Sequence, residues 1–188
     1  MRFVDTVLLG SKLVEVEPHD DERGTFMRLH CEREFEKAGL VFRMVQTNLS
    51  VTRKRGTLRG MHYQTAPSRE SKLVRCVAGA IHDVIIDLRP DSPTFCQSVG
   101  FDLNARDRKA LYVPAGFAHG FLTLSDDAAV LYQMTDYYQP ELARGVRWND
   151  AAFRIRWPVD SMDSVSLNSR DASYANFDRE VVASFAGY

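Results

Sequence analysis

Two short glycine-punctuated segments carry the histidines of this chain that are best placed for acid–base chemistry. Residues 56–64 (GTLRGMHYQ) contain His62, and residues 114–121 (PAGFAHGF) contain His119. Each histidine follows a turn and stands at the start of an apolar run, an arrangement by which a small β-barrel directs side chains into its interior. The two segments therefore predict a barrel with a polar site inside it.

Three further side chains near these segments can donate, accept or stabilise a proton: Lys72, Tyr132 and Asp171. Histidine alone among these types has a reference pKa, about 6.5, that suits a base near neutral pH. Each residue also has an ordinary structural interpretation, as a hydrogen-bonded strand histidine, a solvated lysine, a core tyrosine or a tail carboxylate. Residue type alone does not decide between a catalytic and a structural role for these side chains.

Length and composition indicate one globular domain over residues 1–188. The chain is 45% hydrophobic and 26% charged, which is ordinary for a protein with a core of its own. Its formal net charge is −1, from 24 basic and 25 acidic residues, so there is no electrostatic footprint for nucleic acid or an anionic membrane. We expect no membrane span and no signal peptide.

The cysteines favour a reducing compartment. Cys31, Cys76 and Cys96 are an odd number without metal-ligand spacing. The simplest interpretation is free thiols in the cytoplasm, with Cys76 in the core.

Short strands separated by turn residues dominate the predicted secondary structure. One helix is expected over residues 31–38, ended by Gly39. Strands are expected at residues 1–6, 72–78, 82–89, 98–103, 110–113, 121–124 and 129–135. This spacing indicates an all-β sandwich or closed barrel. The polar segment 161–188 is expected either to pack on or near the site or to fray.

One strand has an ambiguous face. His82, Val84, Ile86 and Leu88 alternate with Ile81, Asp83, Ile85 and Asp87. A face that carries both aspartates and isoleucines could border a site or form a rim.

In its order of motifs the chain resembles the dTDP-4-dehydrorhamnose 3,5-epimerase family of the cupin superfamily. The matching pieces run nearly end to end: residues 21–26, 46–50, 56–64, 72–74, 79, 87–89, 92–94, 114–121, 132, 148–150, 157–158 and 169–171. The resemblance implies a cupin jelly-roll barrel with short peripheral helices, and a homodimer with an N-terminal strand shared between its chains. It also implies a nucleotide-diphospho-4-keto-6-deoxy sugar as substrate, with no cofactor and no metal.

The same resemblance implies catalytic roles. A ketone at C4 acidifies the protons on C3 and C5, and epimerisation returns a proton to the opposite face. By similarity His62 is the base, Asp171 orients it, Tyr132 is the acid, and Lys72 stabilises the enolate oxygen.

Further residues are implied to bind substrate. Arg23 and Arg59 would hold the diphosphate, Gln46 and Asn48 the nucleotide or phosphate, and His119 the sugar. Phe26, Arg28 and Tyr138 complete the expected binding set.

Two positions depart from the family pattern. Arg28 and Ala143 each stand where the family usually carries glutamate. An arginine cannot accept the thymine N3 proton, so the nucleotide could differ from dTDP, or Arg28 could simply face solvent.

Two other classes stay open. A metal-dependent cupin oxygenase or isomerase would use His62 and His119, with Glu70 as the third candidate ligand, because Gln64 replaces the second histidine of the usual pair. A non-catalytic sugar-nucleotide-binding cupin would not need an acid and a base together.

Overall fold

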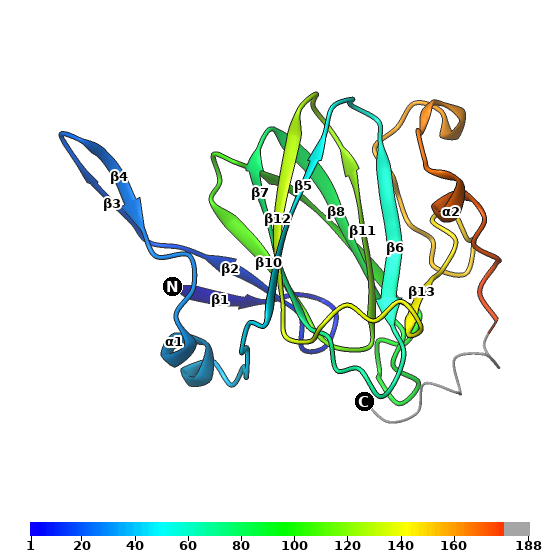
Figure 1. The fold of residues 1–188 in the computed structure, drawn as a ribbon, viewed down its shortest axis with the longest axis horizontal. Helices are drawn as coiled ribbons and strands as arrows, with labels where there is room; N and C mark the ends of the chain where they lie inside the picture. Colours follow the sequence, from blue (N-terminus) through cyan, green and yellow to red (C-terminus); the bar gives the residue numbers. More distant parts are fainter. Residues whose placement is uncertain (179–188) are drawn as a thin grey trace.

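Strand pairing joins distant parts of the chain into two facing antiparallel sheets (Figure 1). The computed structural model describes residues 1–178. One sheet has the order β1 (Arg2–Asp5), β2 (Lys12–Glu15), β10 (Lys109–Val113), β7 (Lys72–Ala78), β12 (Ala128–Met134) and β5 (Gln46–Thr52). The other has the order β13 (Ala143–Gly145), β6 (Leu58–Gln64), β11 (Phe117–Thr123), β8 (Ala80–Asp87) and β9 (Ser98–Asn104).

Helices are short and peripheral, as expected. The predicted helix is confirmed as α1 (Glu32–Lys37), and Gly39 follows it at a φ of +75°, where glycine adopts the left-handed region without strain. The remaining helices are η1 (Met162–Ser164) and α2 (Ser169–Ala172). None of the helices in the described part of the chain has the length and apolar composition needed to cross a bilayer.

The all-β prediction is confirmed, with differences at strand boundaries. The strand expected from residue 121 begins at Phe117, directly after the turn at Gly116, because its first residue already pairs with Asp87 of β8. Residues 82–89 were expected as a strand and β8 covers Ala80–Asp87. Boundaries depend on the pairing partner, which local sequence does not encode.

Three apolar layers hold the sheets. The inner layer, between the sheets, includes Val74, Ile85, Leu111 and Phe121. One outer layer lies under α1, and the second lies under residues 146–178, which we call the C-terminal segment. Both outer faces are thereby partly covered, and the inner layer leaves room at one end of the barrel.

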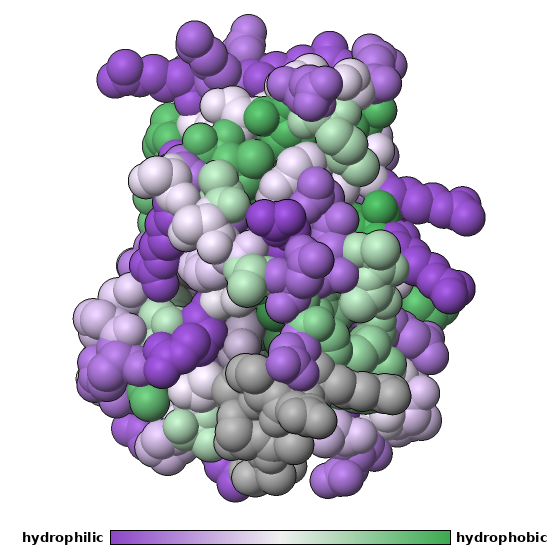
Figure 2. All heavy atoms as spheres, turned by 90° about the vertical axis from the view of Figure 1, so that its right-hand side faces the viewer, coloured by the Kyte–Doolittle hydropathy of each residue, from purple (hydrophilic) through white to green (hydrophobic). Residues whose placement is uncertain are grey.

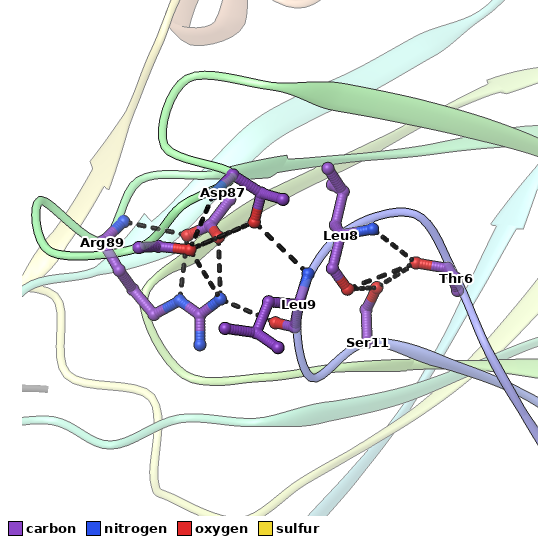
Figure 3. Close-up of polar contacts among 8 residues, drawn as sticks. Thr6, Leu8, Leu9, Ser11, Asp87 and Arg89 are labelled. Carbon is purple, nitrogen blue, oxygen red and sulfur yellow. Dashed lines mark hydrogen bonds and ion pairs between the residues drawn. The ribbon is translucent and has the colours of Figure 1, made fainter.

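The ambiguous face of β8 turns inward. Asp83 and Asp87 are fully buried, so neither forms a solvent rim. Asp83 contacts His119. Asp87 accepts hydrogen bonds from Arg89, Ser92 and Thr94, and Arg89 also donates to the Leu9 carbonyl at 2.6 Å (Figure 3). This cluster joins the β8–β9 turn to the β1–β2 turn.

A two-stranded hairpin projects away from the barrel. Its strands are β3 (Pro18–Asp21) and β4 (Gly24–Met27), and we call residues 18–27 the arm (Figure 1). The buried Arg75 donates to the carbonyls of Leu29 and Arg108, which anchors the chain just after the arm to β7. Burial lowers the pKa of Arg75 to about 10, so it stays charged at neutral pH.

Candidate active site

A cavity of about 400 Å³ opens between the two sheets at one end of the barrel. On β5, β11 and β12 alternate residues line it, following the two-residue period of a β-strand, whereas on β6 an irregularity in the pairing with β11 interrupts this alternation. It is lined from β5 by Gln46, Asn48 and Ser50, from β6 by Arg59, His62 and Gln64, from β11 by His119 and Phe121, and from β7 and β12 by Lys72, Tyr132 and Met134.

His62 and Asp171 form a hydrogen-bonded pair at the cavity wall. The His62 Nε2 to Asp171 Oδ1 distance is 2.8 Å, and the backbone N–H of Gly60 donates to the other carboxylate oxygen at 3.0 Å. Burial by itself would raise the pKa of Asp171, but hydrogen bonds from His62 and Gly60 and the Arg170 charge hold that pKa below its usual value. The carboxylate therefore stays ionised and orients the imidazole.

The C-terminal segment delivers Asp171 to the barrel. Asn168 caps α2 by accepting a hydrogen bond from the Asp171 backbone N–H at 2.7 Å. Ser166 pairs with Thr57 just before β6, so the segment is fixed beside the strand that carries His62. Figure 2 shows this side of the molecule, where polar side chains ring the upper edge and apolar ones lie in patches between them. Of residues 161–178, Asn168, Arg170 and Asp171 line the cavity, and residues 179–188 lie outside the described residues.

A second histidine–aspartate pair lies on the same sheet. His119 Nε2 hydrogen-bonds to the buried Asp83, and His119 is the direct cross-strand partner of His62. The strand register between β11 and β6 therefore brings the two predicted histidines together. The side chain of His119 is 9% exposed, against 42% for His62.

Lys72 enters the cavity as half of a buried ion pair. Its Nζ lies 2.7 Å from Glu70 Oε1, and Gln64 donates to Glu70 Oε2 at 2.8 Å. Lys72, Glu70 and Gln64 are all buried.

Tyr132 projects from the opposite sheet to His62. Burial raises the pKa of its phenol, the negative charge of Glu70 raises it further, and Arg59 opposes both. The phenol therefore stays protonated at neutral pH and can act as an acid. His62 on β6 and Tyr132 on β12 reach one cavity from facing sheets, so the two side chains can address opposite faces of one bound molecule.

Most of the expected binding residues also line this cavity. They are Gln46, Asn48, Arg59, His119 and Tyr138. Gln46 donates to Asn48 at 3.1 Å and accepts from the Tyr138 N–H at 3.1 Å, so the edge strand β5 is tied to the loop after β12.

Three expected binding residues lie outside the cavity of their own chain. Arg23 is exposed on the arm and pairs with Asp21 at 2.5 Å. The side chain of Phe26, also on the arm, is exposed. Arg28 pairs with Glu34 of α1 at 3.0 Å.

Within residues 1–178, no three His, Cys, Asp or Glu side chains come together in a group able to hold a metal ion. The donors considered for a metal site each have protein partners: His62 and His119 bond to aspartates through Nε2, and both oxygens of Glu70 are occupied.

The cavity has further lining residues that were not expected as site residues. Ser50 could have been found from its alternation with Gln46 and Asn48, and Arg170 from its position beside Asp171. Asp83, the partner of His119, lies on the face of β8 that the sequence left ambiguous. Arg144 lies beside Ala143, one of the two departures from the family pattern, and both residues line the cavity.

Comparison with known proteins places these features in a family. The model of the family described as dTDP-4-dehydrorhamnose 3,5-epimerase matches residues 5–179. A curated member from Methanothermobacter thermautotrophicus is 40% identical over 173 residues, which cover 92% of each chain. The chain belongs to the dTDP-4-dehydrorhamnose 3,5-epimerase family. It is therefore an epimerase, an enzyme of the isomerase class.

Solved structures agree with this epimerase in fold. The dTDP-6-deoxy-D-glucose-3,5-epimerase of Legionella pneumophila, solved with dTDP-4-keto-L-rhamnose, has a TM-score of 0.88 at 36% identity and coverage of 96% of both chains. A 3′-monoepimerase from Streptomyces bikiniensis, solved with dTDP-quinovose, has a TM-score of 0.85 at 32% identity and covers 96% of this chain and 88% of its own. The expected cupin jelly-roll fold is confirmed.

Proposed function

We propose that this epimerase converts dTDP-4-dehydro-6-deoxyglucose to dTDP-4-dehydrorhamnose by removing and replacing the protons at C3 and C5. The observation that carries the proposal is the approach of His62 and Tyr132 to one cavity from facing sheets, with Lys72 beside them. A binding protein without catalysis needs no such pair.

In the proposed reaction His62 takes the proton from the carbon next to the C4 ketone, and the electron pair moves to the ketone oxygen as an enolate. Asp171 stabilises the imidazolium through the 2.8 Å hydrogen bond, and the Lys72 ammonium stabilises the enolate oxygen. Tyr132 then protonates the carbon from the opposite face. Solvent removes the proton from His62 and reprotonates Tyr132 before the next cycle.

The test is proton NMR in D₂O with dTDP-4-keto-6-deoxyglucose. Loss of the C3 and C5 proton signals at catalytic rates is the expected result. Exchange at one carbon alone would make the enzyme a mono-epimerase. Absence of exchange with dTDP, CDP, UDP and GDP sugars alike would refute the proposal.

A different nucleotide is a second candidate that rests on Arg28. Its guanidinium is occupied by Glu34 and carries no acceptor for the thymine N3–H. Calorimetric titration with dTDP, CDP, UDP and GDP separates the two candidates: clear dTDP preference removes this one, and preference for CDP supports it.

We further propose a homodimer in which the arm of each chain reaches the other copy. Support comes from the exposed Arg23 and Phe26 on the arm. Exposed apolar side chains on β5 and β7, Leu49, Val51 and Val77, also offer a surface for a second copy. A cytoplasmic location is proposed from the cysteine content and tested by cell fractionation.

A further inference from the structure

Glu70 is a buried carboxylate in the cavity wall for which the proposed reaction has no role. It lies between β6 and β7, and its backbone N–H donates to Ser68 Oγ at 3.3 Å. Its two side-chain oxygens have different partners: Oε1 is 2.7 Å from Lys72 Nζ, and Oε2 accepts from Gln64 Nε2 at 2.8 Å. Burying a carboxylate is costly unless such partners are present.

The orientation of Gln64 is fixed by its other contacts. Gln64 Oε1 accepts from the backbone N–H of Gln139 at 2.7 Å, and Nε2 also donates to the Tyr137 carbonyl at 3.1 Å. Turning the amide over would place a donor against a donor at Gln139 and an acceptor against an acceptor at Tyr137. Gln64 therefore presents only its N–H groups to residue 70.

Only a side chain with two acceptors can complete this arrangement. Residue 70 must accept from Lys72 on one side and from Gln64 on the other. A glutamine there has the same shape but a single acceptor, so it loses one of the two contacts. The four-carbon stem of lysine is flexible, so we expect the Lys72 ammonium to shift when it loses its carboxylate partner.

We propose that Glu70 is a positioning residue of the reaction, whose carboxylate holds the Lys72 ammonium at the place in the cavity where the enolate oxygen forms. This inference rests on the proposed function, because Lys72 has that task only in an enolate mechanism. Glu70 does not itself touch the sugar in this scheme. It acts through Lys72.

The competing explanation is that Glu70 and Lys72 form an ion pair that only stabilises the fold. A double-mutant cycle separates the two, since a residue that acts through Lys72 has nothing to act on once Lys72 is replaced. The four proteins are the wild type, Glu70→Gln, Lys72→Met and the double variant. Their kcat values are measured by deuterium exchange into the keto sugar, with melting temperatures recorded for each.

We expect Glu70→Gln to lower kcat on the order of 100-fold, the size of effect that a misplaced catalytic group produces. In the Lys72→Met background the same change should have little further effect on kcat. Glu70→Asp keeps two acceptors and should retain more activity than Glu70→Gln. The matched control is Asp136→Asn, which removes a carboxylate bound to Ser68 and the Arg69 N–H nearby without lining the cavity, and it should leave kcat little changed.

If Glu70→Gln lowers kcat equally in the wild-type and Lys72→Met backgrounds, or in neither, the inference is overturned. The proposed function still stands in that case, as long as the wild type exchanges the sugar protons. Absence of exchange in the wild type would instead refute the proposed function. Crystal structures of the wild type and Glu70→Gln test the position of the Lys72 ammonium without any measurement of turnover. We expect the ammonium to move in Glu70→Gln, and an ammonium that stays in place would also overturn the inference.

Discussion

Exposure distinguishes the two histidine–aspartate pairs of the cavity. Both histidines bond through Nε2 to a buried carboxylate, yet the His62 side chain is 42% exposed and the His119 side chain only 9%. A base that works once per cycle must return its proton to solvent, which His62 can do and His119 cannot do readily. The base role therefore fits His62, and His119 fits a fixed contact to the sugar.

Replacing either the base or the acid should nearly abolish turnover. We expect His62→Ala and Tyr132→Phe each to lower kcat by about 10²–10⁴, the usual contribution of a placed acid or base. His82→Gln is a matched control, because His82 also pairs with an aspartate, Asp102 at 2.7 Å, but does not line the cavity. Near-full activity of both cavity variants in the exchange assay would contradict the assignment.

The pH dependence of kcat should reflect the protonated Tyr132. Burial and Glu70 raise the pKa of its phenol against the opposing effect of Arg59, so the acid form persists to high pH. The other charged or titratable groups of the cavity are His62, Tyr63, Lys72, His119, Tyr138, Arg144, Arg170 and Asp171. We expect the alkaline limb of kcat to fall only above about pH 10, the reference value for tyrosine. A kcat that already falls below pH 9, in protein that circular dichroism shows to be folded, would argue against Tyr132 as the acid.

At the level of elements, the Asp87 cluster holds the turn between β1 and β2 against the turn between β8 and β9. Asp87 binds Arg89, Ser92 and Thr94, and Thr94 Oγ1 accepts from the Leu9 N–H at 3.3 Å (Figure 3). Asp87→Asn should therefore lower the free energy of unfolding by about 2 kcal/mol, because it leaves a partly buried arginine without its counter-charge. Urea denaturation measures this, with the exposed Asp91→Asn in the same turn as control.

The effect of Asp87 should also vanish in acid. Burial alone would raise the pKa of Asp87, but its hydrogen bonds lower that pKa below the value in the unfolded chain. Because the pKa of Asp87 is lower in the folded protein, its ionised carboxylate stabilises the fold at pH values above the unfolded pKa of about 3.9. This stabilisation is lost as the pH falls through the pKa of the folded protein. The gap between wild type and Asp87→Asn should therefore close below pH 4. A constant gap down to pH 2 would mean that packing, not charge, accounts for it.

Elements with local signals were predictable from the sequence, and those set by distant partners were not. Alternation and turn residues predicted β7, β8, β10 and β12, and Gly39 predicted the end of α1. The three-residue β13 forms only because β6 lies beside it. The polar β3 and exposed β4 bury no alternating face that a pattern could reveal.

The site was predictable in its residues more than in its geometry. Motif resemblance indicated His62, Lys72, Tyr132 and Asp171, all of which line the cavity. The pairing of His62 with Asp171 spans 109 positions, and Asp83 becomes apparent as the partner of His119 only once the strand register is known. Register is a tertiary property, fixed when one face of each strand is buried.

At the scale of the whole molecule, the position of the arm predicts shared sites. Arg23 and Phe26 are exposed on a hairpin that leads away from the cavity of their own chain (Figure 1). If the arm serves a second copy, each cavity of a dimer combines His62 of one chain with Arg23 of the other. Light scattering should then give the mass of two chains.

Mixing two inactive chains tests this arrangement directly. We expect Arg23→Ala and His62→Ala to be impaired alone, and to regain exchange activity when co-expressed with different tags and purified as mixed dimers. One cavity of such a dimer holds both native residues, because His62 comes from the first chain and Arg23 from the second. The matched control is a mixture of Arg59→Ala chains with His62→Ala chains. Because Arg59 and His62 line the same cavity of one chain, neither cavity of this mixed dimer holds both native residues, and no activity should return. Recovery in both mixtures would indicate chain exchange rather than shared sites, and recovery in neither would place the function of the arm within its own chain.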